Sequence, residues 1–316
     1  MGGMQPIVEC VPNFSEGRDA ATIAAIVAAM DVPGAAVLNV TSDADHNRSV
    51  VTLAGSPAAV SEAMFRAIRV AIDEIDMRQH TGVHPRIGAA DVTPFVPLQA
   101  VTMDECIALA EALGERVGRE LETPVYLYGR AARRASRVRL ADVRRGEYER
   151  WVGRVERDPD WAPDFGPARA TPWGACAIGA RDILIAYNLY LDTADETIAM
   201  AIAREIRESS GGLVGVQAKA FVVRHQAQVS MNATDITATP LHVVQDAVKA
   251  AAARLGVAVV RSEVVGLLPQ SAVLAAGRQY LGLEPQPGVT TWEELLLERQ
   301  LFAHLPGFVG RIGAME

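Results

Sequence analysis

The sequence has few cysteines, and they form no paired motif. The three residues, Cys10, Cys106 and Cys176, are odd in number and widely spaced. This usage argues against a disulfide framework, and it fits free thiols in a reducing compartment.

Long apolar runs and an excess of positive charge are also lacking. No stretch of about 18 apolar residues is free of charges or helix breakers, so we expect no membrane span. The N-terminal MGGMQPIVEC shows no basic segment followed by an apolar one, so no signal peptide is expected. A net charge of −8 and a pI near 5.4 argue against nucleic-acid binding but leave room for a local basic pocket. We therefore expect a cytoplasmic protein.

The chain does have the length and apolar content for a sizeable core, with 316 residues of which 50% are hydrophobic. Its first half alternates extended and helical patterns in the order β-α-β-β-α-β. The expected elements are residues 6–17, 19–30, 34–42, 48–55, 56–75 and 91–98. Asp19 and Ser56 are expected helix N-caps. This order is typical of the ferredoxin-like fold.

The second half repeats the same order. Its expected elements are residues 180–191, 193–210, 214–225, 227–234, 240–256 and 257–268, with Thr193 as the cap of the first helix. A further helix at 103–121 and a strand at 124–128 lie between the two copies. The predicted fold is therefore α/β (α+β), with two ferredoxin-like βαββαβ subdomains, residues 1–178 and 179–316, and a groove between them.

The stretch QHTGVHPRIGAADV, residues 79–92, concentrates groups that carry chemistry. His80 and His84 are four residues apart, as in a helical zinc motif, but Gly82 and Pro85 disfavour a helix and the glutamate of that motif is missing. Two histidines bonded to the backbone of a loop are a second interpretation. The third is an acid–base histidine beside an anion clamp, because imidazole titrates near neutrality and the Arg86 guanidinium suits a carboxylate.

Two other segments are unusual. The stretch 129–146 is basic in an otherwise acidic chain, and either a solvated helix face or a rim for a polyanionic tail would explain it. Its arginines are Arg130, Arg133, Arg134, Arg137, Arg139, Arg144 and Arg145. The segment DFGPARATPWG, residues 164–174, combines prolines, glycines and aromatics, which suits either stacking on a flat heterocycle or a buried crossover.

Several of these segments together resemble the glutamate formiminotransferase family. The matching pieces are VECVPNFSEGR (8–18), DADHNRSVVT (43–52), HTGVHPRIGAADVTPFVP (80–97), PVYLYGRAA (124–132), WAPDFGP (161–167), TPWGACAIGARDILIAYN (171–188), QVSMNATD (228–235) and VVGLLP (264–269). They cover most of the chain in the family's order. The resemblance implies two ferredoxin-like subdomains, a homodimer and a stand-alone transferase without a cyclodeaminase.

The resemblance also implies a reaction and its residues. The family moves the formimino group of N-formimino-L-glutamate to N5 of tetrahydrofolate in histidine breakdown, and its catalytic histidine corresponds to His84. This sequence has Thr41 where some relatives carry aspartate, so Asp43 or Asp45 is expected to face the donor amidinium. The residues assigned to binding of the donor, including its carboxylates, are Arg48, Arg86, His80 and Asn13.

The folate stretch of the family maps onto one continuous segment of this chain. It comprises Gly166, Pro167, Ala168, Arg169, Ala170, Thr171, Pro172, Trp173 and Gly174. Tetrahydrofolate is thus the expected co-substrate, and no metal is expected. A polyglutamate tail of the folate is the polyanion that the basic stretch would bind under the second of its two interpretations. A formyltransferase that uses N-formylglutamate, a catalytically silent folate-binding protein and a metal-dependent hydrolase remain alternatives.

Overall fold

A computed structural model describes residues 4–283 and residue 304 of the chain. Contacts divide the chain into two units, Met1–Leu268 and Pro269–Glu316. The first unit contains two β-sheets and their helices. In the described part of the second unit lies α8 (Gln270–Leu281), a helix that the sequence patterns did not predict.

The larger sheet combines strands from the first 180 residues. Its strands are β1 (Ile7–Cys10), β2 (Asn13–Phe14), β3 (Ala35–Asp43), β4 (Arg48–Gly55), β5 (Ala90–Gln99), β6 (Val125–Gly129) and β7 (Cys176–Ala180). β1 and β2 each pair antiparallel with β4 and β5, so β2 continues the course of β1. β3 pairs antiparallel with β4. The resulting order β5-β1-β4-β3 is that of a split βαβ unit, as the sequence predicts.

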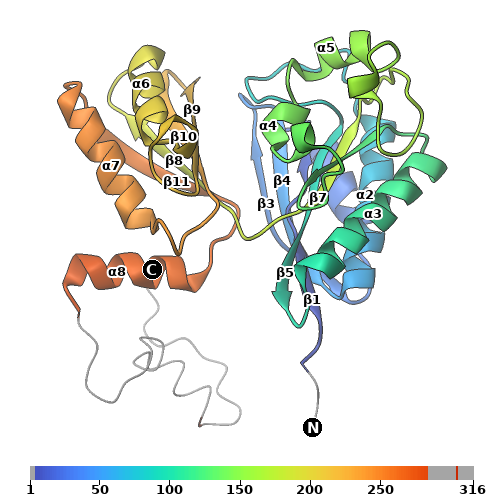
Figure 1. The fold of residues 1–316 in the computed structure, drawn as a ribbon, viewed down its shortest axis with the longest axis horizontal. Coiled ribbons are helices and arrows are strands. Elements are labelled where there is room, and N and C mark those ends of the chain that lie inside the picture. Colours follow the sequence, from blue (N-terminus) through green and yellow to red (C-terminus); the bar gives the residue numbers. More distant parts are fainter. Residues whose placement is uncertain (1–3, 284–303, 305–316) are drawn as a thin grey trace. The chain divides into compact units, whose positions relative to one another are not determined.

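Two helices cover one face of this sheet. α2 (Pro57–Glu74) and α3 (Met103–Glu120) lie side by side against it (Figure 1), and α1 (Ala20–Ala29) packs on α2. The Asp19 and Ser56 side chains accept hydrogen bonds from Ala21 N and Ala59 N, which confirms both predicted N-caps. The apolar side of α2 therefore closes the core over β1, β4 and β5.

Strands β6 and β7 extend the ferredoxin-like part. β7 pairs parallel with both β5 and β6. The sequence patterns missed β7, because its residues CAIGA are small and give neither alternation nor a β-branched run. Its position matters because the segment that enters β7 runs beside the loop before β5.

The connection from β6 to β7 is long and irregular. It contains α4 (Leu140–Val143), α5 (Glu147–Arg154) and the 3₁₀ turns Ala135–Arg137 and Pro159–Trp161. The fully buried Trp151 ties α5 to the core through a hydrogen bond from its Nε1 to the Tyr126 hydroxyl (2.9 Å). The basic stretch lies in this connection and is not one helix, so its interpretation as a solvated helix face is wrong.

The smaller sheet repeats the same order. Its strands are β8 (Ile185–Leu191), β9 (Val216–Val223), β10 (Gln226–Ala233) and β11 (Val259–Val265), all antiparallel in the order β11-β8-β10-β9. α6 (Glu196–Ile206) and α7 (Leu241–Arg254) complete a second βαββαβ pattern. The mixed fold with two such parts confirms the predicted fold class.

Two details of the second half differ from the sequence predictions. The N-cap of α6 is Asp195, whose side chain accepts from Thr197 N, and not Thr193. Thr193 Oγ1 instead accepts from Asp195 N. The first sheet continues through β7 and the second begins with β8, so we propose that the subdomain boundary predicted near residue 178 lies between them, at 181–184.

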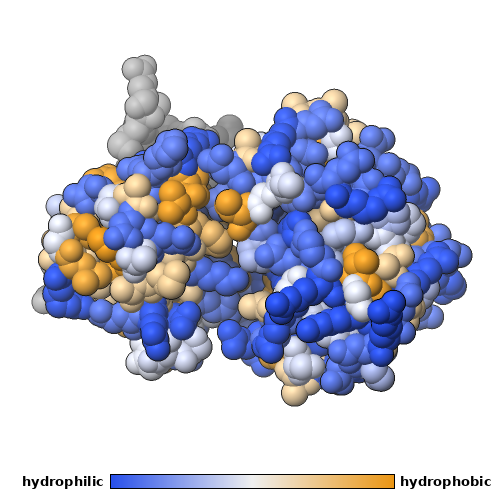
Figure 2. All heavy atoms as spheres, turned by 90° about the horizontal axis from the view of Figure 1, so that it is seen from above, coloured by the Kyte–Doolittle hydropathy of each residue, from blue (hydrophilic) through white to orange (hydrophobic). Residues whose placement is uncertain are grey.

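One face of the described residues is mostly hydrophilic. Figure 2 shows polar side chains over most of one face, with hydrophobic ones in small separate patches. Among the described residues, no helix is both long and apolar enough to cross a membrane.

Candidate active site

Three loops that are distant in the sequence are joined by hydrogen bonds at one end of the larger sheet. Asn47, in the turn between β3 and β4, donates from Nδ2 to the carbonyl of Thr81 (3.0 Å) and accepts from Gly17 N (3.0 Å). Val83 N donates to the carbonyl of Asp45 (3.2 Å). The loop before β5 is thus held by the turn after β3 and the segment after β2, three of the segments in which the sequence concentrates polar residues.

Glycine at two positions lets these segments approach closely. A Cβ on Gly82 would lie 2.4 Å from the carbonyl oxygen of His46, and one on Gly88 would lie 2.1 Å from that of Ala175. Neither distance is compatible with a side chain. The glycines of the HTGVHPRIG segment therefore let its histidines and arginine meet groups from other loops.

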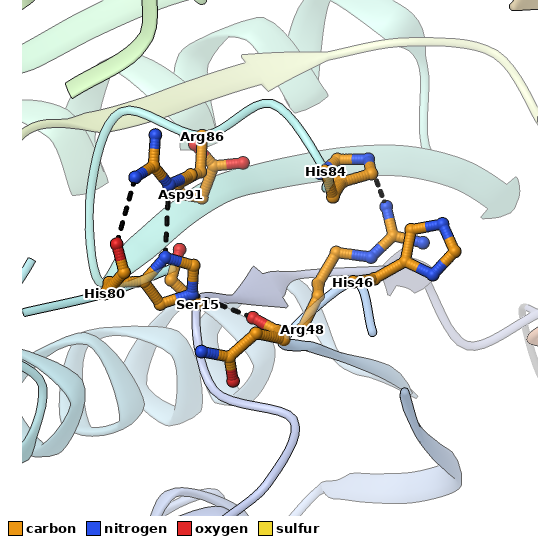
Figure 3. Close-up of a pocket in the computed structure, with 8 residues that line it drawn as sticks. Ser15, His46, Arg48, His80, His84, Arg86 and Asp91 are labelled. Atoms are coloured by element: carbon orange, nitrogen blue, oxygen red, sulfur yellow. Dashed lines mark hydrogen bonds between the residues drawn. The ribbon is translucent and has the colours of Figure 1, made fainter. Parts of the chain in front are cut away.

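A small pocket opens where the loops meet. It is lined by Ser15, His46, Asn47, Arg48, His80, His84, Arg86 and Asp91. Figure 3 shows the guanidinium of Arg48 reaching toward the His84 ring, while Arg86 points to His80. Four predicted site residues, namely His80, His84, Arg48 and Arg86, thus share one pocket. Asp43, Asp45 and Asn13 are not among its lining residues.

His84 is held as a neutral ring. Arg48 Nη1 lies 2.5 Å from His84 Nε2. Because a guanidinium has only donors, Nε2 must accept this hydrogen bond, and the proton of the neutral ring is on Nδ1. Burial, followed by the positive charges of Arg48 and Arg144, lowers the pKa of His84 well below its ordinary value. Without a ligand, His84 is therefore uncharged at neutral pH.

Positive charge surrounds this ring. Burial and the neighbouring Arg144 lower the pKa of Arg48 to about 10, so the Arg48 guanidinium remains charged at neutral pH. Among the described residues, no carboxylate lies within ion-pairing distance of Arg48, although Asp43 and Asp91 act on it from farther away. A pocket of this kind favours an anionic ligand.

Asp91 fixes one side of the pocket. Its Oδ1 accepts from Ile87 N (2.8 Å) and its Oδ2 accepts from Arg144 Nη2, and the carboxylate is almost fully buried. Arg144 Nε is buried and has no hydrogen-bond partner. The sequence analysis missed both roles. The available signal was an aspartate at the start of an apolar strand, where a buried charge requires a partner.

His80 links two loops in the opposite tautomer. Its Nε2 donates to the carbonyl of Asn47 (2.9 Å), and its Nδ1 accepts from Arg86 Nε (3.1 Å). Burial lowers the pKa of His80 as well. With both nitrogens occupied, His80 is suited to positioning the loop.

All three nitrogens of the Arg86 guanidinium donate hydrogen bonds. It pairs with Glu147 (2.6 Å) and Glu149 (2.6 Å) in the first turn of α5, and it also donates to the carbonyl of His80 (3.2 Å). Only 6% of the residue is exposed. Arg86 therefore fastens the loop to α5 in this structure, and its assignment to the donor carboxylates stays a prediction.

The predicted catalytic carboxylates lie in the turn between β3 and β4. Asp43 Oδ1 accepts from Asp45 N (2.9 Å), His46 N (2.8 Å) and His46 Nδ1 (3.0 Å). Partial burial acts in the other direction, but the hydrogen bonds from His46 keep the pKa of Asp43 below its usual value. Asp45 is exposed. Asp43 thus orients His46, whose ring centroid is 6.1 Å from that of His84.

The side chain of Asn13 makes a local contact. Its Nδ2 donates to the carbonyl of Val11 (3.2 Å), in the segment between β1 and β2. Its assignment to substrate binding also stays a prediction.

The stretch assigned to folate supports the loop of His84. The carbonyls of Pro172 and Trp173 accept from Met77 N (2.8 Å) and Ala89 N (2.8 Å), on either side of that loop. Trp173 is half-buried and donates from Nε1 to Thr123 Oγ1 (3.1 Å). The earlier residues 166–170 are more exposed. Residues 171–174 therefore have a structural task whether or not they also bind a ligand.

The seven arginines of the basic stretch are dispersed. Arg137 is buried and pairs with Asp164 (2.7 Å), while Arg144 pairs with Asp91, which lines the pocket. Arg130 and Arg133 pair with Asp182 and Glu111 on the surface, and Arg134 donates to backbone carbonyls. The remaining two, Arg139 and Arg145, pair with Asp142. The stretch is therefore not one continuous exposed rim.

Neither thiol nor metal chemistry is evident in the part of the chain that the structure describes. No group of three or more His, Cys, Asp or Glu residues there could hold a metal ion. All three cysteines are free and buried. Burial raises the pKa of Cys10 well above its usual value and that of Cys176 to about 12, so both remain thiols.

The fold has two ferredoxin-like parts, and its pocket holds a neutral histidine among arginines. Comparison of the sequence with protein families gives the class of protein. Residues 7–181 match the formiminotransferase domain, N-terminal subdomain, and residues 186–294 match the formiminotransferase domain. The chain belongs to the formiminotransferase family.

Individual relatives are similar over most of the chain. Glutamate formimidoyltransferase of Streptococcus pyogenes serotype M1 is 44% identical over 89% of this chain and 95% of its own length. The protein of the same name from Thermoplasma acidophilum is 44% identical over 88% of this chain and 93% of its own. Formimidoyltransferase-cyclodeaminase of Gallus gallus is 45% identical over 89% of this chain, which spans about half of that longer protein (53%).

Proposed function

We propose that this chain is a glutamate formimidoyltransferase, which moves the formimino group of N-formimino-L-glutamate to N5 of tetrahydrofolate in histidine degradation. Its membership of the formiminotransferase family supports this activity. So does its similarity to two proteins with that name over nearly their whole length.

The observation that carries the chemistry is a neutral His84 beside an arginine that has no carboxylate partner within ion-pairing distance among the described residues. A neutral imidazole can accept a proton, and a charged guanidinium can hold the carboxylate of a glutamyl donor. The proton comes from N5 of the folate and the carboxylate belongs to the donor, so both groups must lie where the two substrates meet, and they are 2.5 Å apart.

The proposed reaction uses His84 as a proton carrier. The lone pair of N5 attacks the amidinium carbon of the donor and forms a C–N bond. N5 then becomes acidic and gives its proton to His84. His84 passes a proton to the glutamate nitrogen as the bond from that nitrogen to the carbon breaks, so glutamate leaves as a neutral amine. General acid–base assistance of this kind contributes roughly 10²–10⁴-fold.

The low pKa of His84 affects the two proton transfers differently. A ring that is held neutral is ready to accept a proton, but it is a weak base. Once protonated, it is a strong acid and donates readily to the departing nitrogen. We therefore propose that proton removal from N5 is the more demanding of the two transfers.

We propose Arg48 as the main carboxylate anchor and assign Arg86 to holding the loop. The guanidinium of Arg86 is already paired with Glu147 and Glu149. In the same way, Asp43 is proposed to act through His46, since its Oδ1 is engaged there. Asp45 remains the candidate for facing the amidinium directly, because it is exposed at the same turn.

For the folate we propose the segment 166–174, with Trp173 as the aromatic surface. The hydrogen bonds from Met77 and Ala89 to this segment support the proposal, because they would couple folate binding to the loop of His84. We further propose a cytoplasmic homodimer, as the family resemblance implies, with neither nucleic acid nor membrane as a partner.

A donor panel tests this function. The purified chain is mixed with tetrahydrofolate and with N-formimino-L-glutamate, N-formyl-L-glutamate or formate, and the absorbance of the one-carbon folate product is followed. We expect turnover with the formimino donor. Turnover with only the formyl donor would identify a formyltransferase, and folate binding without any turnover would identify a silent binding protein. Either result would refute the proposed activity.

A further inference from the structure

The hydrogen bond between Arg48 and His84 occupies the nitrogen that a base requires. His84 Nε2 accepts from Arg48 Nη1, and the other ring nitrogen carries the proton of the neutral form. In this arrangement the ring has no lone pair available for a substrate. A residue with the proposed task of accepting a proton is therefore blocked in the ligand-free protein.

Arg48 differs from the other arginines around the pocket. Arg86 pairs with Glu147 and Glu149, and Arg144 pairs with Asp91. Among the described residues, Arg48 has no carboxylate within ion-pairing distance, and its guanidinium donates a hydrogen bond to the His84 ring. A guanidinium binds a carboxylate through two charge-assisted hydrogen bonds, which are stronger than one bond to a neutral ring.

From this geometry we propose that Arg48 is a substrate-operated latch. Its hydrogen bond blocks His84 Nε2 until a carboxylate of the glutamyl donor binds the guanidinium in place of the ring. The ring nitrogen is then free to accept a proton. The inference rests on the proposed function for the identity of the donor. The exchange itself needs only a carboxylate ligand.

The surroundings favour movement of Arg48 over its neighbours. Arg144, whose charge also acts on the ring, is tied to Asp91, and His46 is tied to Asp43. Asp91 and Asp43 reach Arg48 only by longer-range attraction. Lys219 of β9 adds a further positive charge that acts on His84. Among the described residues neither Arg48 nor Lys219 has an ion-paired carboxylate to release, and of the two Arg48 is the one that donates to His84.

The exchange would also change the ring as a base. The positive charge of Arg48 contributes to the low pKa of His84. A bound carboxylate offsets that charge and raises the pKa of His84 toward its ordinary value. By linkage, the same carboxylate binds more tightly as the pH falls through this pKa, because the protonated ring attracts it. The base would therefore become both accessible and stronger when the donor is in place.

The test uses the whole protein and glutarate, an unreactive dicarboxylate with the carboxylate spacing of the donor. Nitrogen NMR of the histidine rings, with the His84 signal assigned by its loss in His84→Gln, follows tautomer and titration with and without saturating glutarate. We expect glutarate to raise the pKa of His84 and to shift Nε2 from its Arg48-bonded position. Acetate at equal concentration should have a weaker effect.

Variants separate the latch from general charge effects. In Arg48→Met, His84 should titrate at higher pH even without a ligand, and glutarate should bind about 10- to 100-fold more weakly, the range for losing a charge-assisted pair. Arg48→Lys keeps the charge but not the fork, and should restore only part of the affinity. Arg66→Met removes an exposed arginine that pairs with Glu62 on α2, and should change neither property.

Two results would overturn the inference. One is a His84 titration that saturating glutarate leaves unchanged in the unmodified protein. The other is glutarate affinity that Arg48→Met does not reduce, in a variant whose NMR spectrum shows it to be folded. Both are independent of turnover. A failed donor panel with an intact glutarate response would reject the proposed activity and leave the latch standing.

Discussion

Replacing Gly82 with alanine tests whether the close packing of the loops positions His84. The new Cβ would lie 2.4 Å from the carbonyl oxygen of His46 and 3.0 Å from Cβ of Asn47. The backbone at Gly82 does not have a positive φ, so alanine itself is conformationally tolerated there. The whole effect of Gly82→Ala must therefore come from steric overlap with the turn after β3.

The size of the effect follows from the distance. Relief of the overlap requires a separation of about half an ångström or more, because neither the His46 carbonyl nor the Asn47 Cβ can move away by a side-chain rotation. Overpacking of this kind typically costs about 1–3 kcal/mol of stability. A misplacement of about 1 Å at a catalytic group can lower turnover by about 10²-fold. We thus expect turnover to fall about 10- to 100-fold, with a stability loss of about 1–3 kcal/mol.

The assay combines steady-state turnover at saturating substrates with urea unfolding. Gly153→Ala is the matched control, because it lies in α5 with no atom within 4 Å of the added Cβ. That substitution should raise stability by up to about 1 kcal/mol through helix propensity and leave turnover unchanged. If Gly82→Ala retained turnover within about twofold, the tight contact between the loops would not be what positions His84.

Four further outcomes are expected. His84→Ala should lower turnover by roughly 10²–10⁴-fold and His80→Ala by much less; the reverse order in steady-state kinetics would make His80 the proton carrier. Arg86→Met should cost about 1–3 kcal/mol in urea unfolding by removing the charge-assisted hydrogen bonds that join the loop to α5, and should raise KM for both substrates alike; a rise for the donor alone would return Arg86 to the donor site. Stability should fall as the pH drops below about 6.5, because the unfolded His84 binds a proton that the folded one resists, and His84→Gln should reduce this dependence in urea midpoints. Exchanging both Arg133 and Arg134 for glutamate should erase any preference for polyglutamate over monoglutamate folate and leave monoglutamate turnover unchanged. Binding curves at low and high salt measure this preference. If the double variant keeps the preference, this surface does not bind the polyglutamate tail.

The elements and their order follow from features that are local in the sequence. Asp19 and Ser56 each cap a helix through a hydrogen bond to a residue two or three positions later, so their role can be predicted from a short window. Alternating and helical periodicities indicated both βαββαβ patterns for the same reason. The loop of His84 also stood out locally, because glycine, proline and histidine cluster in it.

Predictions from short windows of sequence failed where the interacting residues are far apart along the chain. β7 is a strand because it lies between β5 and β6 in the sheet, although its own residues carry little strand preference. The glutamates that pair with Arg86 are 61 and 63 residues away along the chain, so no short window could indicate them. Arg144 appeared to be part of a surface stretch, and it is tied to Asp91 in the pocket.

The sequence by itself determined which residue types and which loops are available for chemistry, since capping, periodicity and turn formation depend on neighbours along the chain. Only the tertiary structure decided which charges neutralise each other. Arg86 and Arg48 have the same side chain, yet the first is surrounded by carboxylates and the second contacts a histidine. A buried charge is stabilised by the groups that surround it in space, and folding brings these from distant parts of the chain.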